Sequence, residues 1–274
     1  MPAHSRLASF FGYDDVANLY DRSRPSYPDA LVDDVLTFAQ VAKGGKVLEI
    51  GCGTGQATTS FAPHDLQLVC LEPGPSLARI ARERLRSFEN VEVICQTFEA
   101  WAAAPSALDL IFSATAFHWV RRDVRFVKAA HALRPGGTLA VFNAVARPQA
   151  LPIPDSVKRI IKSDPAISNT AQPWPFERQF SESRAFGTLE KRSYFTKRSY
   201  DVEGFAELLR TLNRFRKLPT HEQASVLGAA RTAVESQGGS IALDFRIGLS
   251  MAHHEPKRPW WRRLSPRRSR SDAG

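Results

Sequence analysis

A glycine-rich turn preceded by an acidic residue is the first feature of the sequence that could do chemistry. In the segment Val-Leu-Glu-Ile-Gly-Cys-Gly-Thr-Gly-Gln, Glu49 lies two positions before three alternating glycines, Gly51, Gly53 and Gly55. Glycines at this spacing let the backbone approach a ligand closely where a strand passes into a helix. A dinucleotide motif would need glycine in place of Gln56, and a P-loop would need a lysine that is missing. An acid here would repel a pyrophosphate, so the turn suits a ligand with ammonium and sulfonium groups.

A second acidic residue, Glu72, follows the apolar run at residues 66–71. At the carboxyl end of a neighbouring parallel strand, a carboxylate can accept hydrogen bonds from both hydroxyls of a ribose. An ordinary strand-to-helix turn would account for the glycines alone. It does not account for a strand, an acidic glycine turn and an acid at the tip of the next strand in that order. We therefore predict a cofactor site, and S-adenosylmethionine is a ligand with the required groups.

The elements that must position these residues alternate between strand and helix. Short apolar runs, typical of buried strands, occur at residues 46–50, 66–71, 91–95, 108–114 and 138–143. Helical patterns lie between them at residues 56–61, 75–87 and 123–133. Arg134–Gly137 is expected to end the last of these helices. The alternation predicts βαβ units and a parallel sheet covered on both faces.

The chain before and after this core has a different character. Two short helices are predicted at residues 14–21 and 28–38, and the proline-rich residues 148–187 are expected to form an irregular insertion. The remaining elements are expected to be a strand at 189–200, helices at 202–212 and 221–236, and a strand at 241–252. Antiparallel pairing of the last two strands is expected, because helices join them and no further crossover follows.

These elements predict a single domain over residues 1–252. Its expected parts are an N-terminal helical cap at 10–40, a cofactor-binding core at 41–147, and the insertion with closing strands and helices at 148–252. Residues 253–274 are expected to be a disordered basic tail. Residues 255–274 carry seven Lys or Arg against two acids, hence +5 of the total net charge of +9. The tail could contact an anionic lipid or nucleic acid, but a solvated extension is the simpler interpretation.

The composition narrows the class of protein. The hydrophobic fraction of 43% and the charged fraction of 24% are typical of soluble globular chains. The sequence contains no run of about 18 apolar residues that could span a membrane, and residues 1–15 lack a secretory signal pattern. The three cysteines, Cys52, Cys70 and Cys95, lack the spacing of a zinc site or a disulfide framework. We therefore expect a cytoplasmic protein without a bound metal.

The motifs resemble, in order and spacing, those of the class I S-adenosylmethionine-dependent methyltransferases. The segments that carry the resemblance are 47–58, 71–73, 90–101, 108–120 and 132–142. The opening Tyr-Asp-x-x-Arg-Pro-x-Tyr-Pro, from Tyr20 to Pro28, resembles the subset related to bacterial trans-aconitate methyltransferase. The resemblance covers residues 10–252 and is strong over 17–145. It implies a Rossmann-like, doubly wound α/β sheet of seven strands whose last strand is antiparallel.

The resemblance also implies a set of residues that bind S-adenosylmethionine. The set is Tyr20, Arg24, Glu49, Gly51, Cys52, Gly53, Gly55, Gln56, Glu72, Pro73, Thr97, Phe98, Ala114 and Thr115. The glycines would contact the methionine part of the cofactor, with Glu49 near its ammonium group. Glu72 would hold the ribose, and Pro73 would lie beside the adenine. Thr97 and Phe98 would border the adenine edge.

One position departs from the family pattern. The family usually has a Gly-Asp pair where this chain has Gln96-Thr97. The aspartate often accepts a hydrogen bond from the adenine amino group, which Thr97 would accept less strongly. Backbone groups near Phe98 are therefore expected to supply part of the adenine contact. Ala114 and Thr115 would form the floor under the sulfonium.

Candidate catalytic residues are Tyr20, His118 and Trp119. Methyl transfer is an in-line displacement that depends mainly on holding the acceptor in position and excluding water. His118 and Trp119 follow the fourth predicted strand, at the mouth of the cofactor site. A similar His-Trp pair in plant salicylate-type carboxyl methyltransferases favours a carboxylate acceptor. The alternative is that His118 is structural and that Trp119 packs beneath the next helix.

Tyr20, Arg24 and Tyr27 form a second candidate cluster. The resemblance implies that the N-terminal helices fold over the cofactor and bring Tyr20 near the transferring methyl group. Arg24 would bind a carboxylate, for which a guanidinium is well suited. The alternative is that this Arg-Pro-x-Tyr-Pro segment is only a rigid linker between two helices.

Three function classes remain open. The motifs favour transfer of a methyl group to a small molecule, most simply to a carboxylate or hydroxyl oxygen. The net charge permits a nucleic-acid methyltransferase, but no Asp/Asn-Pro-Pro-Tyr/Phe motif follows the fourth strand. A non-catalytic protein that binds the cofactor and acts through partners is the third class.

Overall fold

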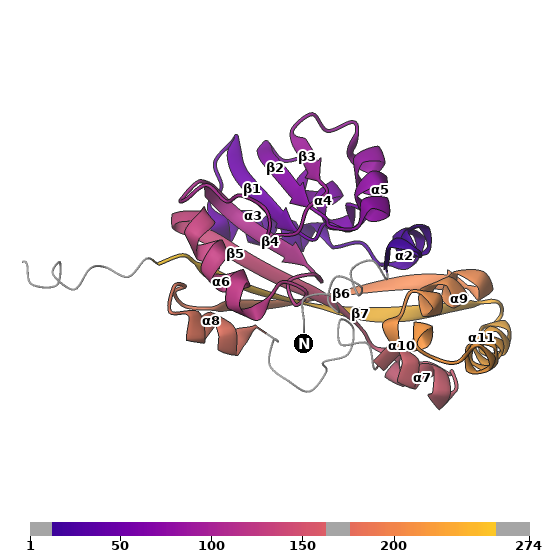
Figure 1. Ribbon diagram of the computed structural model, residues 1–274. Coiled ribbons are helices and arrows are strands. Elements are labelled where there is room, and N and C mark those ends of the chain that lie inside the picture. The colour runs from indigo at the N-terminus through magenta and orange to yellow at the C-terminus, as the bar shows by residue number, and fades with distance from the viewer. Residues whose placement is uncertain (1–12, 163–175, 256–274) are drawn as a thin grey trace, which may run out of the picture.

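Seven strands form one continuous sheet in the computed structural model, which describes residues 13–162 and 176–255 (Figure 1). The strands are β1 (Gly45–Ile50), β2 (Leu66–Leu71), β3 (Val91–Ile94), β4 (Leu108–Ala114), β5 (Leu133–Ala146), β6 (Glu190–Asp201) and β7 (Ser240–His253). Their order across the sheet is β3-β2-β1-β4-β5-β7-β6. Neighbours among β1–β5 are parallel, whereas β7 runs antiparallel to both β5 and β6. The predicted doubly wound α/β sheet with a reversed last strand is confirmed.

Helices cover both faces of the parallel strands. The helices are α2 (Ala17–Ser23), α3 (Asp29–Ala39), α4 (Gln56–Phe61), α5 (Pro75–Leu85), α6 (Arg122–Ala132), α7 (Asp155–Lys162), α8 (Glu177–Ser183), α9 (Val202–Arg210), α10 (Asn213–Arg216) and α11 (Thr220–Glu235), with a 3₁₀ turn at Pro148–Ala150. The main core has two layers: α3, α4 and α5 pack on one face of the sheet, and α6 and α8 pack on the opposite face. In α3, for example, Leu31, Val32 and Val35 recur at helical spacing and are buried.

The order of the strands creates a gap at the carboxyl ends of β1 and β4. The chain proceeds from β1 outward to β2 and β3, and then returns to place β4 on the other side of β1. The connections that leave β1 and β4 therefore diverge to opposite sides of the sheet. Open α/β sheets bind ligands at such a switch point. The glycine turn after β1 lies at this position.

Strands β6 and β7 extend beyond the main sheet and carry a second core. Figure 1 shows these two long strands running to the group formed by α7, α9, α10 and α11. Along β7, Leu249 and Met251 belong to the main core, whereas Leu243 and Phe245 pack with α7, α9 and α11. One strand therefore connects both parts of the molecule through continuous backbone hydrogen bonding.

The N-terminal helix α2 is held against this second part by polar contacts. The Tyr200 hydroxyl donates to the Ser23 carbonyl at 2.8 Å, and the guanidinium of Arg198 donates to the carbonyls of Arg22 and Arg24. Arg22 also forms a salt bridge with Glu207 at 2.7 Å. The described part of the predicted helical cap is therefore fixed in position by β6 and α9.

Three details differ from the sequence-based expectation. Residues 148–187 contain α7 and α8 among their described part, because Val157, Ile160, Ile161 and Phe180 provide buried helical faces. Strand β5 begins at Leu133, so Arg134–Gly137 belongs to a strand with an irregular register rather than to a helix stop. Strand pairing continues past residue 252, because β7 ends at His253 and His254 forms an antiparallel β-bridge with Phe186. Residues 256–274 of the predicted tail lie outside the described residues.

No helix among the described residues is long and apolar enough to cross a membrane. The elements are instead amphipathic or buried between other elements. In β6, for instance, burial alternates along most of the strand, as expected for an edge strand with one covered face. Most large apolar side chains of the described helices and strands are buried, with Val127 and Phe195 as exposed exceptions.

Replacing Phe112 by Ala tests the assignment of the main core. Phe112 is fully buried in β4 and stacks on Phe61 of α4, with ring centroids 4.1 Å apart. The loss of transfer free energy and the resulting cavity should lower the free energy of unfolding by about 3–5 kcal/mol. Phe195→Ala in β6 is the matched control, because this ring is 63% exposed. Its expected loss is below about 1 kcal/mol. Urea unfolding measures both variants, and equal losses would contradict the assigned core.

Candidate active site

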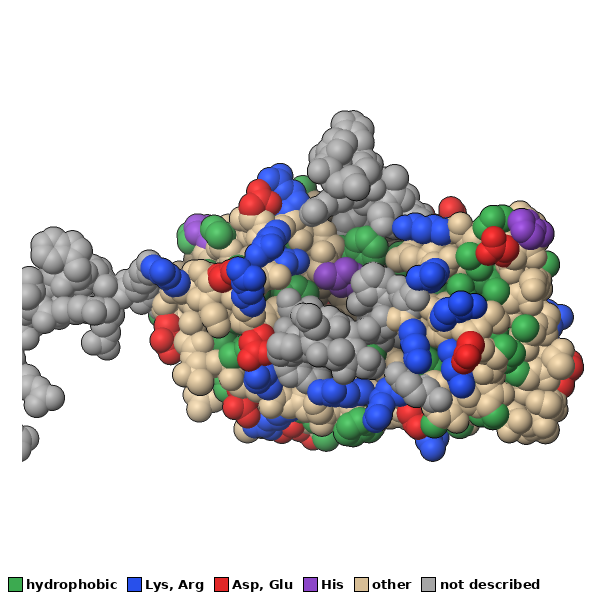
Figure 2. Space-filling view, turned by 90° about the horizontal axis from the view of Figure 1, so that it is seen from below, with side chains coloured by type: hydrophobic (Ala, Val, Ile, Leu, Met, Phe, Trp, Pro, Cys, Tyr) green, Lys and Arg blue, Asp and Glu red, His purple; other side chains and the backbone are tan. Residues whose placement is uncertain are grey.

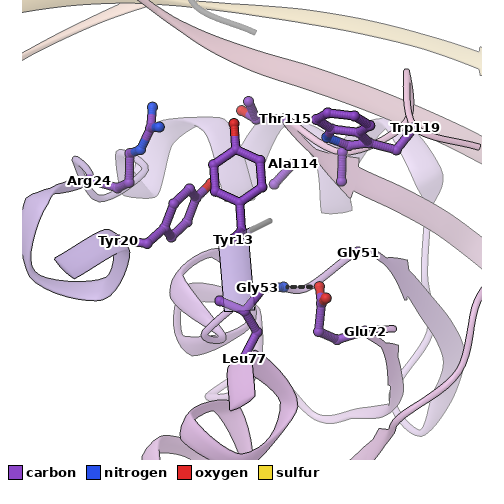
Figure 3. Close-up of a pocket in the computed structure, with 11 residues that line it drawn as sticks. Tyr13, Tyr20, Arg24, Gly51, Gly53, Glu72, Leu77, Ala114, Thr115 and Trp119 are labelled. Atoms are coloured by element: carbon purple, nitrogen blue, oxygen red, sulfur yellow. Dashed lines mark hydrogen bonds between the residues drawn. The ribbon is translucent and has the colours of Figure 1, made fainter. Parts of the chain in front are cut away.

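An open cavity of about 620 Å³ lies at the carboxyl ends of β1, β2 and β4 (Figure 3). The residues that line it are Tyr13, Tyr20, Arg24, Gly51, Gly53, Glu72, Leu77, Ala114, Thr115, Ala116 and Trp119. The tertiary structure thus brings together residues from the predicted cap, the glycine turn, and the ends of β2 and β4. Tyr13, Leu77 and Ala116 line this cavity although the sequence motifs do not single them out.

The glycine turn needs glycine both for its backbone conformation and for space. Gly51, Gly53 and Gly55 all have positive φ angles, which side chains rarely allow. A Cβ at Gly51 would collide with the side chain of Ala116. At Gly53, by contrast, the nearest atom to such a Cβ is a ring carbon of Tyr20 at 4.0 Å, so the turn faces the cavity there. The backbone of Gly51 and Gly53 can therefore approach a ligand directly.

Glu72 joins the glycine turn to the tip of β2. Its Oε2 accepts a hydrogen bond from the Gly53 amide at 2.9 Å, and its Oε1 accepts one from the Gly74 amide at 2.8 Å. The residue is only 5% exposed. Burial raises the pKa of Glu72 to about 7, with a smaller increase from Asp14, although the two amides oppose the shift. Each carboxylate oxygen retains acceptor capacity for a ligand hydroxyl.

A smaller, mainly apolar cavity of about 280 Å³ adjoins the first. It is lined by Ile50, Gly51, Leu71, Pro73, Gln96, Thr97, Phe98, Glu99, Ala116, Trp119 and Val120. The two cavities share Gly51, Ala116 and Trp119. The Thr97 hydroxyl accepts a hydrogen bond from the Ala100 amide at 3.2 Å, so it also stabilises the turn that follows β3.

Contacts with α6 hold this turn in place. The Lys128 ammonium donates to the Glu99 carbonyl at 2.9 Å and to the Trp101 carbonyl, and it lies 5.3 Å from the ring centroid of Phe98. The Glu99 carboxylate in turn accepts a hydrogen bond from the Arg121 amide at 2.8 Å. The loops that follow β3 and β4 are therefore connected on the far side of the smaller cavity.

Aromatic rings border the first cavity on the side of the cap. In Figure 3 the ring of Tyr13 stands between Tyr20 and Trp119. It meets both edge-to-face, at centroid distances of 5.5 Å and 6.2 Å. The Arg24 guanidinium lies 4.7 Å from the ring centroid of Tyr20 and donates to the Thr211 hydroxyl at 3.4 Å. These contacts orient the rings toward the space in front of the glycine turn.

Asp14 anchors Tyr13 to the start of α5. Its carboxylate accepts hydrogen bonds from the Ser76 amide at 2.6 Å, the Ser76 hydroxyl at 2.8 Å and the Leu77 amide at 3.2 Å. The free amides of a helix N-terminus favour such an acidic partner. The sequence signal for Tyr13 is weak, because nothing before the cap motif indicates that this ring reaches the glycine turn.

The floor of the cavity is formed by the residues that follow β4. Thr115 has a φ angle of 56°, an unusual conformation for a β-branched residue. Its hydroxyl lies 3.1 Å from the Tyr27 hydroxyl and accepts a hydrogen bond from the Ala144 amide at 3.3 Å. Burial raises the pKa of Tyr27 above its ordinary value. Tyr27 thus contacts the floor from behind rather than lining the cavity.

The remaining predicted cofactor residues do not line either cavity. Glu49 is fully buried behind the glycine turn, where its Oε2 accepts a hydrogen bond from the Thr58 hydroxyl at 2.5 Å. Its Oε1 has no hydrogen-bond partner among the described residues, and burial raises its pKa to about 7. Cys52 is buried, and Gly55 precedes α4 and packs against Leu85.

Gln56 and His118 also lie outside the lining. The Gln56 amide donates to the Asp21 carbonyl at 2.9 Å and so connects the glycine turn to α2. The His118 ring packs against Trp119 at a centroid distance of 4.9 Å. Within the described parts of the chain, no group of His, Cys, Asp and Glu could hold a metal ion. The lining of the larger cavity instead offers backbone amides, aromatic rings, one guanidinium and one carboxylate.

Comparison with known proteins agrees with this arrangement. Residues 47–137, from the glycine turn to the start of β5, match the family model described as a methyltransferase domain. An uncharacterized methyltransferase from Mycobacterium tuberculosis is 29% identical over 222 residues, which cover 78% of this chain and 88% of that protein. The matched segment contains every strand-end that contributes to the cavity.

Solved structures share the same fold. A candidate type II methyltransferase from Anaeromyxobacter dehalogenans gives a TM-score of 0.58 at 22% identity, covering 85% of this chain and 99% of that one. Phosphoethanolamine N-methyltransferase 2 from Haemonchus contortus was solved with S-adenosyl-L-methionine. It gives a TM-score of 0.51 at 16% identity, and the match covers 91% of this chain and 57% of that one. Residues 47–137 thus match a methyltransferase domain, and the chain is similar to methyltransferases in sequence and in the order of its strands.

Proposed function

We propose that the protein transfers the methyl group of S-adenosylmethionine to an oxygen atom of a small-molecule acceptor. The observation that carries this proposal is the pair of adjoining cavities that share Gly51, Ala116 and Trp119. One cavity has backbone amides, Glu72 and aromatic rings, and the other is apolar and narrow. A molecule with a charged amino-acid part, a ribose and a flat base would use both. The Haemonchus relative, solved with this cofactor, supports the same ligand.

The residues present fit the parts of this cofactor. Glu72 has lone pairs for the ribose hydroxyls, while Pro73 and Phe98 provide an apolar boundary for adenine. Glu49 is fully buried behind the glycine turn and lines neither cavity, so we assign it an indirect electrostatic effect on the ammonium group. Arg24 is the cation of the described lining, so we assign it to the cofactor carboxylate. Thr97 borders the adenine edge, as the resemblance implies.

Catalysis would depend on position and on the exclusion of water. When bound, the cofactor supplies a methyl group already attached to a good leaving group. The rings of Tyr13, Tyr20 and Trp119 border the space above the glycine turn, where they can exclude water and interact favourably with a cation. Trp119 can also donate its indole N–H to an acceptor oxygen. His118 lines neither cavity, whereas Trp119 lines both, so Trp119 is the better candidate and a catalytic role for His118 remains a prediction.

The lining favours an acceptor that arrives ionised. Glu72 is the one carboxylate in the described lining of the larger cavity, and we assign its remaining lone pairs to the ribose hydroxyls. A protonated acceptor would need a general base, whereas a carboxylate would not. Lys and Arg side chains are numerous over the whole face shown in Figure 2, including its right-hand part. A small carboxylic acid is therefore the first acceptor class to test.

Replacing Glu72 by Gln tests the cofactor site directly. The variant keeps the size of the side chain but loses the negative charge and one acceptor oxygen. At pH 8, where Glu72 is ionised, S-adenosylhomocysteine affinity should fall about 10- to 100-fold, because charge-assisted hydrogen bonds to the ribose are weakened. Isothermal titration calorimetry measures the change, with Glu92→Gln on the exposed side of β3 as the control. Unchanged binding by the Glu72 variant, or no binding by folded wild type, would contradict the proposal.

The two buried carboxyls give the ligand-free protein a pH dependence. In the folded state Glu49 and Glu72 keep a proton to a pH of about 7, compared with an ordinary value of 4.5. The folded state therefore binds more protons than the unfolded state between these pH values, and the unfolding free energy falls as pH rises through them. Glu49→Gln should reduce this decline. Thermal unfolding at several pH values between 4.5 and 7.5 would measure it, and a slope equal to that of wild type would exclude the effect of Glu49.

A further inference from the structure

We propose that Tyr27 is a positioning residue, which acts through Thr115 to fix the cavity floor beside the transferring methyl group. The inference rests on the proposed function and on the predicted position of the cofactor's sulfonium above Ala114 and Thr115. It adds a residue that does not itself line the cavity. Its basis is the unusual backbone conformation of Thr115 and the set of contacts that holds it.

Thr115 is held in a conformation that its side chain disfavours. A threonine with a φ angle of 56° is strained, because its β-branched side chain crowds the backbone in the left-handed region. Such strain persists only where surrounding contacts over-determine the conformation, and it is concentrated at functional sites. Here Thr115 stands directly after β4 and lines the larger cavity next to the glycine turn.

Three hydrogen bonds secure this residue from the side away from the cavity. The Thr115 amide donates to the Phe142 carbonyl at 2.8 Å. The Thr115 hydroxyl accepts from the Ala144 amide at 3.3 Å and pairs with the Tyr27 hydroxyl at 3.1 Å. The Tyr27 ring is itself fixed edge-to-face against Phe142, with a centroid distance of 5.0 Å. Tyr27 is thus the side-chain partner that binds the rotatable hydroxyl of Thr115.

The arrangement couples the N-terminal cap to the floor. Tyr27 lies in the short connection between α2 and α3, whereas Thr115 directly follows the central strand β4 and Phe142 belongs to β5. Gly51 is in close contact with Ala116, the residue that follows Thr115. A shift of Thr115 would therefore alter the space beside the glycine turn. S-adenosylmethionine differs from S-adenosylhomocysteine by the methyl group on sulfur, so the ratio of their affinities reports on that space.

Removing the Tyr27 hydroxyl tests this role without an identified acceptor. In Tyr27→Phe, the affinity for S-adenosylmethionine should fall about fivefold more than the affinity for S-adenosylhomocysteine, an effect comparable to one lost hydrogen bond. Calorimetric titration with each ligand measures the ratio. Equal changes for the two ligands, or no change for either, would overturn the proposal.

Tyr200→Phe is the matched control for the loss of a buried tyrosine hydroxyl. Its hydroxyl bonds the Ser23 carbonyl at 2.8 Å, so it also attaches the cap, but it does not touch the floor. This variant should leave the affinity ratio unchanged. A change as large as that of Tyr27→Phe would assign the effect to general loosening of the cap.

Thr115→Gly tests whether the effect passes through the strained residue. Glycine adopts a positive φ without strain, so Tyr27→Phe should have no further effect on the affinity ratio in this background. A Tyr27→Phe effect that persists unchanged in Thr115→Gly would show that Tyr27 acts by another route.

Hydrogen exchange in the ligand-free protein separates this inference from the proposed function. The Thr115 and Ala144 amides should exchange faster in Tyr27→Phe and remain as in wild type in Tyr200→Phe. Unchanged exchange in Tyr27→Phe would refute the structural link even if both ligands bind. If wild type bound neither ligand, the proposed function would fail, whereas the exchange result would still decide whether Tyr27 holds Thr115.

Discussion

The site depends on one buried carboxylate that joins the ends of two neighbouring strands. Glu72 at the tip of β2 accepts hydrogen bonds from the amide of Gly53 in the glycine turn and from the amide of Gly74 at the start of α5. Because a buried carboxylate is stable only when its acceptors are satisfied, these amides and this side chain require one another. The glycine turn is thereby held at the edge of the sheet with its backbone open to the larger cavity.

The same region combines rigid packing below with polar attachment above. Below the turn, the strands and helices enclose apolar cores in which Glu49, Thr58 and Cys70 form a small buried polar group. Above it, Asp14 binds the start of α5 and Gln56 binds α2. Apolar burial stabilises the sheet as a whole, whereas directional hydrogen bonds determine where the cap lies. The lining residues are thus held by contacts on two sides.

The long strand β7 gives the cap a second support. It pairs with β5 in the main sheet and with the whole of β6, so the second core is continuous with the main core. Arg198 and Tyr200 of β6 then reach back to the carbonyls of α2. An acceptor site built between the cap and the second core would consequently vary with residues far from the cofactor motif. Such an arrangement would explain why the sequence contains clear cofactor motifs but no local motif that indicates the acceptor.

The sequence alone determined the alternation of strands and helices from β1 to β5, because apolar spacing acts locally. It also predicted the reversed last strand and the edge of the sheet at which a cofactor would bind. It also indicated that Glu72 and Trp119 would approach the glycine turn. Only the tertiary structure placed Tyr13 between two rings, moved Glu49 and His118 away from the lining, and set Tyr27 behind Thr115. It likewise revealed α7 and α8 in the proline-rich insertion. These outcomes depend on contacts between distant segments, whose geometry is decided by packing rather than by neighbouring residues.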